Sequence, residues 1–476
     1  MIIGRHNEID RLHKAYNSET SEFVVVYGRR RVGKTFLVRE TFNNTFTFYH
    51  TGLSNSPLRK QLANWQSSLK EYGNKKRVRF PRTWLDAFDL LKELINSSKE
   101  EKKVIFLDEM PWMDTPRSGF VTALEHFWNG WASARNDILL VACGSATSWM
   151  MNKVIRNKGG LHNRVTVRIP LRPFILHECE EYAKSKKLGF TRKQIMQCYM
   201  VMGGVPYYWS FLDRSMSLAQ NIDNIFFDPE GQLHDEFNEL YASLFRKPEM
   251  YVKIIRTLSI KRIGMTREEI LQSDKEIYDN GKLTQVLEDL ESCGFIRKYT
   301  SFGYTDKHAI YQLMDSYTLF YYRFIGENKH NDPHFWSANQ DSPVFYNWNG
   351  LAFERVCLDH VRQIKKALGV EGVVSNEYGW QSKGNKDKDT IGAQIDLLID
   401  RNDDVIDLCE MKFTKLPYSM TEDEYDKIQN RKNRFIIETG TTKAVHLILV
   451  AAAGVKRNSY IDDFQNVVTG DDLFED

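Results

Sequence analysis

The feature that most constrains the fold is a glycine-bracketed turn close to the amino end. In "FVVVYGRRRVGKTFLVRE", the β-branched and aromatic run Phe23–Tyr27 favours a buried strand. Gly28 follows, then four residues, then Gly33, Lys34 and Thr35, after which an apolar pattern with helical spacing begins. Strand, loop and helix in this order match G-x-x-x-x-G-K-[ST], whose backbone N–H groups and helix N-terminus cradle phosphates. We therefore predict a nucleoside triphosphate site here; a chance glycine-rich turn is the alternative.

The residues of this loop are expected to divide the work of holding ATP. The Lys34 ammonium would reach the β- and γ-phosphates, and the Thr35 hydroxyl would bind Mg²⁺. The others would approach the phosphates through the backbone, since glycine lets the chain come close. The predicted nucleotide-binding set in the loop is Gly28, Arg29, Arg30, Arg31, Val32, Gly33, Lys34 and Thr35.

Two further apolar runs end in polar residues that suit the same site. Val104–Leu107 is apolar enough to be buried on both faces, as in a parallel sheet, and Asp108 and Glu109 follow it. Open α/β sheets bind ligands at the carboxyl ends of such strands. We expect Asp108 to hold Mg²⁺ through water and Glu109 to polarise the attacking water, the alternative being an exposed acidic strand end. The run "ILLVACGS" ends at Ser145, either a γ-phosphate sensor or a plain turn serine.

The composition of the chain limits the number of domains, the kinds of partner and the compartment that we expect. At 476 residues the chain is too long for one core, so we expect two to four domains. Its 65 Lys+Arg and 63 Asp+Glu give a net charge of +2, which provides no global attraction to nucleic acid or anionic membrane. The six cysteines include no C-x-x-C pair, which favours buried free thiols in a reducing cytosol over a zinc cluster. No apolar run reaches membrane-spanning length, so we expect a cytoplasmic protein without membrane contact.

Residues 1–225 resemble AAA+ and STAND-like archaeal and bacterial ATPases. The resemblance is carried by "IIGRHNEIDRL", the phosphate loop, "FLDE", "CGS" and "GGVP", in that order. It implies a P-loop NTPase parallel sheet with a helical lid. It also implies that Gly4 and Arg5 lie near the adenine, and that Gly204 and Pro206 touch the nucleotide from the lid.

The resemblance leaves the arginine finger unassigned, because no motif for it stands out. Three arginines compete for that role in "HNRVTVRIPLRPF", and Arg164 is our nominee over Arg168 and Arg172. Ring assembly, the oligomeric state and the turnover rate are therefore left open.

The segment 226–330 has the pattern of a winged helix-turn-helix. Thr266, with Glu269 three residues later, reads as a capping box, and a helix with core spacing and two short strands follow. Lys282, Thr284 and Gln285 could contact DNA near the start of that helix. Its expected exposed face also carries Glu288, Asp289 and Glu291, which phosphates would repel, so we favour a packing or relay role over DNA reading.

The stretch "VIDLCEMKF", residues 405–413, places charges inside an apolar strand. Alternation puts Glu410 and Lys412 on one face, roughly 7 Å apart. A preceding strand carries Asp396, joined by a polar turn at Arg401–Asp404 that predicts a hairpin. Asp396 and Glu410 could then share one Mg²⁺ or Mn²⁺ with the Met411 carbonyl, while Lys412 orients a water or stabilises phosphate charge. The alternative is a set of structural ion pairs between these groups.

The spacing D-x₁₃-E-x-K, preceded by a helix carrying Glu354, resembles the PD-(D/E)XK restriction-endonuclease-like nucleases over residues 340–455. The resemblance implies catalytic roles for Asp396, Glu410, Lys412 and Glu354. The combination of this part with the ATPase-like part resembles a widespread prokaryotic family whose C-terminal part is a domain of unknown function.

The predicted fold class is multidomain α/β. Residues 1–225 would form the P-loop ATPase with its lid, 226–330 the winged-helix module, and 335–476 an α/β restriction-endonuclease-like domain. The predicted function is an ATPase whose nucleotide state controls a metal-dependent nuclease acting on nucleic acid. The alternative is a nucleotide-gated regulatory or scaffold protein that binds DNA or a protein partner and cuts nothing.

Overall fold

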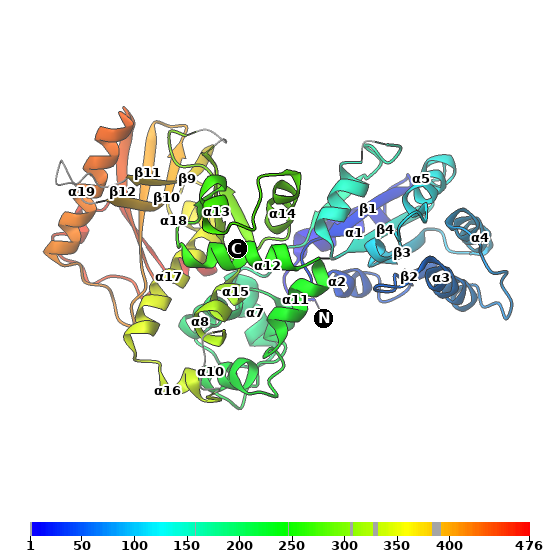
Figure 1. Cartoon of the computed structure of the whole chain (residues 1–476), viewed down its shortest axis with the longest axis horizontal. Helices are drawn as coiled ribbons and strands as arrows, with labels where there is room; N and C mark the ends of the chain where they lie inside the picture. Colours follow the sequence, from blue (N-terminus) through cyan, green and yellow to red (C-terminus); the bar gives the residue numbers. More distant parts are fainter. Residues whose placement is uncertain (1, 158, 246, 305–307, 327–331, 383–391) are drawn as a thin grey trace. The chain divides into compact units, whose positions relative to one another are not determined.

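The computed structural model describes residues 2–157, 159–245, 247–304, 308–326, 332–382 and 392–476 (Figure 1). The chain forms two compact units, Met1–Pro173 and Phe174–Asp476. Among the residues that the structure describes, the first unit contains one sheet and the second contains two. The finer division into 1–225, 226–330 and 335–476 stays a prediction.

A five-stranded parallel sheet is the centre of the first unit. Its strand order is β2-β3-β4-β1-β5, and every neighbouring pair is parallel. The predicted runs Phe23–Tyr27 and Val104–Leu107 fall within two of these strands, so the expected parallel sheet is confirmed. The strands are β1 (Glu22–Tyr27), β2 (Phe48–Thr51), β3 (Lys103–Asp108), β4 (Ile138–Gly144) and β5 (Val167–Pro170).

Helices cover both faces of this sheet. Val24 and Val26 of β1 pack in a cluster with α1 and α2, while Phe23 and Val25 point to the opposite face, towards α3, α4 and α5. Burial on both faces explains why these strands are continuously apolar. The helices are α1 (His6–Tyr16), α2 (Lys34–Thr41), α3 (Leu58–Tyr72), α4 (Trp84–Ser97), α5 (Phe120–Gly130) and the short α6 (Thr147–Trp149).

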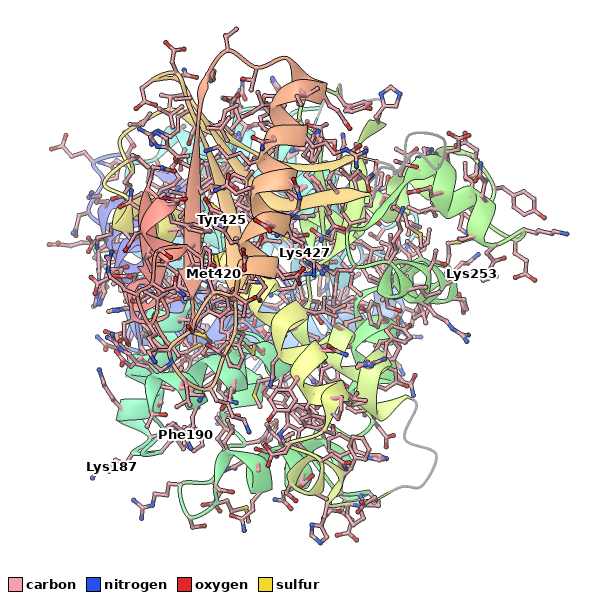
Figure 2. All side chains as sticks on the ribbon, turned by 90° about the vertical axis from the view of Figure 1, so that its left-hand side faces the viewer. Lys187, Phe190, Lys253, Met420, Tyr425 and Lys427 are labelled. Atoms are coloured by element: carbon pink, nitrogen blue, oxygen red, sulfur yellow. The ribbon has the colours of Figure 1, made fainter. Side chains whose placement is uncertain are left out.

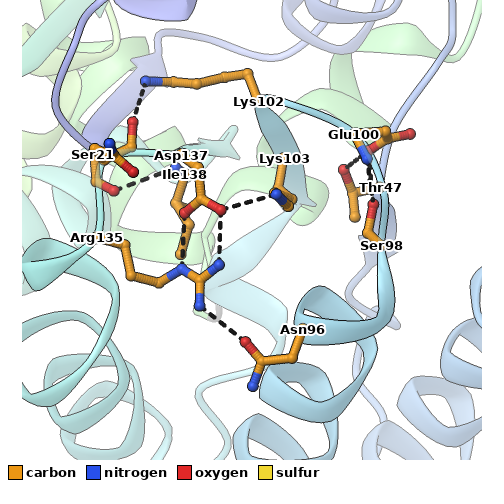
Figure 3. A network of polar contacts seen from close by, with 11 residues as sticks. Ser21, Thr47, Asn96, Ser98, Glu100, Lys102, Lys103, Arg135, Asp137 and Ile138 are labelled. Atoms are coloured by element: carbon orange, nitrogen blue, oxygen red, sulfur yellow. Dashed lines mark hydrogen bonds and ion pairs between the residues drawn. The ribbon is translucent and has the colours of Figure 1, made fainter.

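Ion pairs close the edge of this sheet at which β3 and β4 begin (Figure 3). The Asp137 carboxylate accepts bonds of 2.7 Å from both Nε and Nη2 of Arg135 and lies 2.9 Å from Lys103 Nζ. The hydrogen bonds from Arg135, and then those from Lys103, lower the pKa of Asp137. Arg135 Nη1 donates to Asn96 Oδ1 at 2.9 Å. The acidic residue here is neutralised by its neighbours, whereas the phosphate loop lies at the opposite edge.

The second unit begins with helices and a small sheet. A three-stranded antiparallel sheet, in the order β6-β8-β7, follows. β6 lies between α12 and α13, and β7 and β8 come after α14. The helices are α7 (Leu176–Ser185), α8 (Arg192–Met202), α9 (Pro206–Trp209), α10 (Leu218–Ile222), α11 (Glu236–Leu244), α12 (Glu249–Ile260), α13 (Arg267–Ser273), α14 (Gly281–Ser292), α15 (Ser316–Phe320) and α16 (Phe335–Ala338). The strands are β6 (Met265–Thr266), β7 (Ile296–Tyr299) and β8 (Ile310–Leu313).

A mixed five-stranded sheet forms the C-terminal part of this unit. Its order is β13-β12-β11-β10-β9; β9, β10 and β11 pair antiparallel, and β11, β12 and β13 pair parallel. The predicted hairpin with its turn at Arg401–Asp404 is therefore confirmed. The strands are β9 (Ser375–Ser382), β10 (Ala393–Arg401), β11 (Val405–Lys412), β12 (Ala444–Ala451) and β13 (Asn466–Thr469).

Helices lie against this sheet as well. α19 (Glu422–Thr439), which carries Tyr425 and Lys427, lies over this sheet (Figure 2). It packs on the sheet through Ile428 and Phe435. α17 (Pro343–Asp359) contacts the region of β11, where the rings of Phe353 and Phe413 lie 5.6 Å apart. The helix that carries Glu354 does not extend through the whole run "WNGLAFERVCLDHVRQI". It breaks at His360, and α18 (Val361–Ala367) continues beyond.

Two other sequence expectations concern the whole chain. All six cysteines are free and buried, as predicted. Across the described ranges, no helix is both long and apolar enough to cross a bilayer.

Candidate functional site

The loop between β1 and α2 has the backbone that the glycine pattern predicts. Gly28 has φ +146°, and a Cβ there would lie 2.1 Å from the Leu171 carbonyl oxygen, a distance no side chain can accept. Gly33 has φ +89° and precedes the first residue of α2. Gly28 therefore allows the loop to pass close to the chain after β5, and Gly33 lets the loop turn into the helix.

Lys34 and Thr35 stand at the N-terminus of α2. The Lys34 ammonium is buried and donates to the carbonyl oxygens of Gly28 (2.9 Å) and Arg29 (2.8 Å). The Thr35 hydroxyl donates to Asp108 Oδ2 at 2.8 Å. The Lys34 ammonium can exchange the loop carbonyls for phosphate oxygens. The Thr35 hydroxyl can exchange the Asp108 carboxylate for a metal ion.

The ends of β3 and β4 complete the group. Asp108 is buried; burial, and then the charge of Glu109, raises its pKa, while the bond from Thr35 opposes this. Glu109 has φ +46°, uncommon for a residue with a side chain. Its Oε2 accepts from the Ser145 hydroxyl (2.8 Å) and backbone N–H (3.3 Å). The structure thus brings Thr35, Asp108, Glu109 and Ser145 together from three elements, and it binds Ser145 to Glu109, a contact we did not predict.

The rest of the predicted loop set divides by burial. Val32 is in the hydrophobic cluster beneath α1 and α2, so it can offer a ligand only its backbone. Arg29 is buried, and Arg30 and Arg31 are half-buried, the latter with φ +72°. Arg5, with φ +62°, donates from Nη2 to the Arg172 carbonyl at 2.7 Å, which ties the amino end to the chain after β5. Its predicted proximity to adenine, like that of Gly4, stays a prediction.

Three predicted nucleotide-binding residues lie outside the phosphate loop: Gly204, Pro206 and Arg164. A Cβ on Gly204 would lie 1.8 Å from the Phe174 carbonyl oxygen, and the two backbones are joined by a 2.6 Å bond. Pro206 is the first residue of α9, where a missing N–H costs nothing. Both belong to the second unit, so their contact with a nucleotide stays a prediction. Arg164 is exposed in a turn before β5, and its role as arginine finger also stays a prediction.

Comparison with known proteins covers much of the chain. Residues 2–211 match the family model of an ATPase domain predominantly from Archaea. The chain contains a P-loop ATPase domain. An uncharacterized protein of Methanocaldococcus jannaschii, MJECL04, is 23% identical over 379 residues, which are 77% of this chain and 78% of that protein. An uncharacterized ATP-binding protein of the same organism, MJ0423, is 36% identical over 44 residues, 9% of this chain and 75% of that protein.

Two solved structures show more distant similarity to this chain. The Walker-type ATPase PABY2304 of Pyrococcus abyssi has 15% identity and a TM-score of 0.48, with 68% of this chain and 96% of that chain covered. The Aeropyrum pernix ORC2 protein, in ADPNP–ADP complexes, has 12% identity and a TM-score of 0.38, with 65% and 89% covered.

A second group of acidic residues lies in the C-terminal sheet. Asp396 is on β10, Glu410 and Lys412 are on β11, and Glu354 is on α17. Leu397 pairs with Cys409, and continuing this register by one residue places Asp396 opposite Glu410. The four predicted residues therefore come from one helix and two adjacent strands. We call Glu354, Asp396 and Glu410 the carboxylate centre.

Each acidic residue of the carboxylate centre contacts a cationic side chain. Arg262 Nη2 lies 2.9 Å from Glu354 Oε1 and 2.6 Å from Asp396 Oδ2. Glu410 lies 3.1 Å from Lys412 Nζ and 2.8 Å from Nη2 of Arg431, which is on α19. The predicted alternative for Glu410 and Lys412, an ion pair, is thus present. Within the described ranges, no three His, Cys, Asp or Glu side chains are grouped to hold a metal ion as they lie.

The pKa of Glu354 is strongly raised. Burial, and then the charge of Asp396, raises its pKa to about 8, against the opposing charges of Arg262 and Arg355. Its Oε2 is buried, and among the described residues no hydrogen-bond donor reaches it. A buried carboxylate oxygen without a partner is costly, so this oxygen is suited to an additional cation.

One prediction about α14, next to the three-stranded sheet, is wrong. Asp289, predicted on the exposed face of α14, is buried and accepts 2.6 Å bonds from the Tyr251 hydroxyl and from Gln285 Nε2. Gln285, a predicted DNA contact, is therefore already occupied by Asp289. Glu288 and Glu291 are exposed as predicted. The winged-helix assignment itself stays a prediction.

Sequence reasoning missed Arg262 and Arg431. Arg262 lies between α12 and β6, in "SIKRIGMT", and Arg431 lies within a helix rich in both charges. Neither belongs to a motif, and each reaches its carboxylate only through the fold. No local signal could have identified them.

Proposed function

We propose that the ATPase domain controls, through its nucleotide state, a metal-dependent nuclease-like centre that acts on nucleic acid. The observation that carries this proposal is the convergence of Glu354, Asp396, Glu410 and Lys412, with a buried Glu354 oxygen that no described residue satisfies. A carboxylate group with a lysine beside it is suited to phosphodiester hydrolysis.

At the nucleotide site, the chain's own groups would exchange partners when ATP binds. Lys34 would leave the Gly28 and Arg29 carbonyls for the β- and γ-phosphates, and Thr35 and Asp108 would turn their oxygens to Mg²⁺. Glu109 would polarise the attacking water, and Ser145, which holds its carboxylate, would keep it oriented. The positions of these groups around the loop support these roles.

At the carboxylate centre, the donor set suits Mg²⁺ or Mn²⁺, since hard cations prefer carboxylate oxygens. Asp396, Glu410 and Glu354 would hold such an ion, and the Met411 carbonyl is proposed as a further ligand. The bound ion would supply an activated water for attack on phosphorus. Lys412, 3.1 Å from Glu410, would stabilise the negative charge that develops on the phosphate.

Packing within the second unit supports a connection between the two activities. The match to the ATPase family extends to residue 211 and so includes α7 and α8. The N–H of Leu176, the first residue of α7, donates to His360 Nε2 at 2.9 Å, directly after α17. The ring of Tyr199 on α8 lies 5.4 Å from that of His360. The last helices of the ATPase domain thus pack against the helix that carries Glu354, so their movement would reach it.

The decisive test is cleavage of DNA by the purified chain. With Mn²⁺ or Mg²⁺, it is expected to degrade plasmid or single-stranded DNA, and Lys412→Ala should abolish this while ATP binding is unchanged. Lys443→Ala is the matched control, because Lys443 forms a 2.7 Å ion pair with Asp400 on the same sheet. Equal cleavage by both variants would contradict the role of Lys412.

A second candidate function is a nucleotide-gated regulatory or scaffold protein that cuts nothing and binds DNA or a protein partner. It is favoured by the ion pairs that occupy the carboxylates. The exposed Glu288 and Glu291 on α14 oppose a DNA-reading role for that helix and favour packing. Absence of cleavage under every nucleotide and metal condition would select this candidate.

A further inference from the structure

One cation in the carboxylate centre comes from a distant part of the second unit. Arg262 lies between α12 and β6, and its single Nη2 atom contacts both Glu354 and Asp396. One positive group bridging two carboxylates performs the task of a divalent ion. It uses one oxygen of each, Oε1 of Glu354 and Oδ2 of Asp396, so that guanidinium and metal ion would compete for the same atoms.

The backbone of Arg262 is fixed, which makes this contact a built feature. Its carbonyl oxygen accepts from Gln312 Nε2 on β8 at 2.8 Å and from Arg355 Nη2. Gly264, two residues later, has φ +92°, and a Cβ there would lie 2.4 Å from the Tyr311 carbonyl oxygen. The helix α17 therefore holds Arg262 twice, by the side chain through Glu354 and by the backbone through the neighbouring Arg355.

The side chain of Arg262 can still leave without disturbing the core. It is 42% exposed, whereas the side chains of Glu354 and Asp396 are only 12% and 15% exposed. Movement of the guanidinium into water would open the two carboxylates and leave the surrounding apolar packing in place. Glu354 Oε1 and Asp396 Oδ2 would then be available to a metal ion, together with the Glu354 Oε2 that no described residue satisfies.

We propose that Arg262 is a displaceable guanidinium plug that keeps divalent metal ions out of the carboxylate centre until the segment between α12 and β6 withdraws it. This inference rests on the proposed function, because it assigns the regulation of that same centre. The Arg262 carbonyl is bonded to Gln312 on β8 and to Arg355 on α17. A displacement of the three-stranded sheet that breaks the bond to Arg355 would therefore move the plug away from α17 and open the metal site.

The test is Mn²⁺ binding by the full chain, measured by titration calorimetry and by the electron paramagnetic resonance signal of free Mn²⁺, without nucleotide. Arg262→Ala is expected to bind Mn²⁺ about tenfold more tightly than the unaltered chain or more, because a competing cation is removed. Lys261→Ala is the matched control, since the adjacent Lys261 pairs with Glu269 instead, at 2.6 Å. Adding Asp396→Asn to Arg262→Ala should remove the gained affinity.

A variant with uncompensated carboxylates could fold poorly, so Arg262→Gln, which keeps a donor and loses the charge, provides a second measurement. Its thermal midpoint should rise more on addition of Mn²⁺ than that of the unaltered chain. Unchanged or weaker Mn²⁺ binding by folded Arg262→Ala or Arg262→Gln would overturn the plug.

Cleavage assays on the same proteins separate this inference from the proposed function. Tighter Mn²⁺ binding without any DNA cleavage would support the plug and count against the nuclease. Full cleavage by the unaltered chain, at the same Mn²⁺ dependence as Arg262→Ala, would support the nuclease and overturn the plug.

Discussion

The two acidic groups of this protein, one in each unit, differ in where their neighbouring cations lie. At the phosphate loop, Lys34 is held on carbonyl oxygens and Asp108 is bonded to a hydroxyl. In the carboxylate centre, Arg262, Lys412 and Arg431 contact the carboxylates directly. A hydroxyl is easily exchanged for a ligand, but a buried ion pair must be broken first. The first group is therefore arranged for a ligand, whereas the second is neutralised by its own cationic neighbours.

The largest effect is expected at Glu109, and it tests whether the first group is ready for catalysis. Glu109→Gln should retain ATP binding and lower the rate of phosphate release by roughly 100- to 10,000-fold, the usual contribution of a general base. Glu93→Gln, an exposed position on α4, is the control. Phosphate release measured beside nucleotide binding separates the two steps, and unchanged turnover would refute the role of Glu109.

Next in size is the loss of the loop cation. Lys34→Ala should weaken ATP binding by roughly 1,000-fold, because two charge-assisted contacts to phosphates are lost. Lys412→Ala should leave ATP affinity unchanged, since Lys412 belongs to the other group. Titration calorimetry with ATP and Mg²⁺ measures both. An equal loss of ATP affinity in the two variants would contradict the assignment of Lys34 and Lys412 to separate sites.

A stability measurement tests whether the loop of the first group is fixed before ATP arrives. Gly28→Ala should lower the free energy of unfolding by about 3 kcal/mol, because the new Cβ would meet the Leu171 carbonyl oxygen at 2.1 Å. Gly33→Ala should cost only about 1 kcal/mol, since its strain is conformational and no atom lies within 4 Å. Denaturant unfolding without nucleotide gives both values. Equal costs would mean that the loop adapts.

The smallest effect is a loss of folding stability at low pH, which comes from a histidine buried in the first unit. Burial lowers the pKa of His50, on β2 beside β3, to about 3, so the folded chain keeps the ring neutral. Between about pH 6.5 and 3 the unfolded chain binds the proton and the folded chain does not, so stability falls as the pH falls. The loss at pH 5 is about 2 kcal/mol.

His50→Phe should reduce this acid sensitivity, because the ring already packs among Phe48 and Trp65. Hydrogen exchange of the β2 and α3 amides at pH 7 and pH 5 localises the effect to the first unit. An identical pH dependence in the variant and the unaltered chain would show that His50 does not carry it.

The sequence was sufficient for the first group because its chemistry is local. The loop, the strand that ends at Asp108 and the strand that ends at Ser145 each have their own pattern, and parallel strands bring their carboxyl ends together. The same reasoning gave the hairpin with Asp396 and Glu410. The Ser145–Glu109 bond was not predicted, since it depends on side-chain rotamers.

The second group could be predicted only in part. Arg262 and Asp396 are 134 positions apart, and nothing in the residues around Arg262 indicates their contact. The prediction that Asp289 is exposed was wrong because it used helical spacing alone. In the structure the Tyr251 hydroxyl gives this side chain a buried partner. Cation–carboxylate pairing between distant segments is set by tertiary packing, which period and motif do not encode.

The junction at His360 decides how this chain can be divided for study. A fragment that starts at Phe335 would lack the Leu176 N–H and the Tyr199 ring that contact His360, so this side chain, buried in the whole chain, would lose part of its cover. The same fragment would lack the Arg262 carbonyl that Arg355 holds. The shortest piece that keeps the C-terminal sheet in its native surroundings therefore begins at Phe174, and any catalytic trial on a shorter one would be made on an incomplete scaffold.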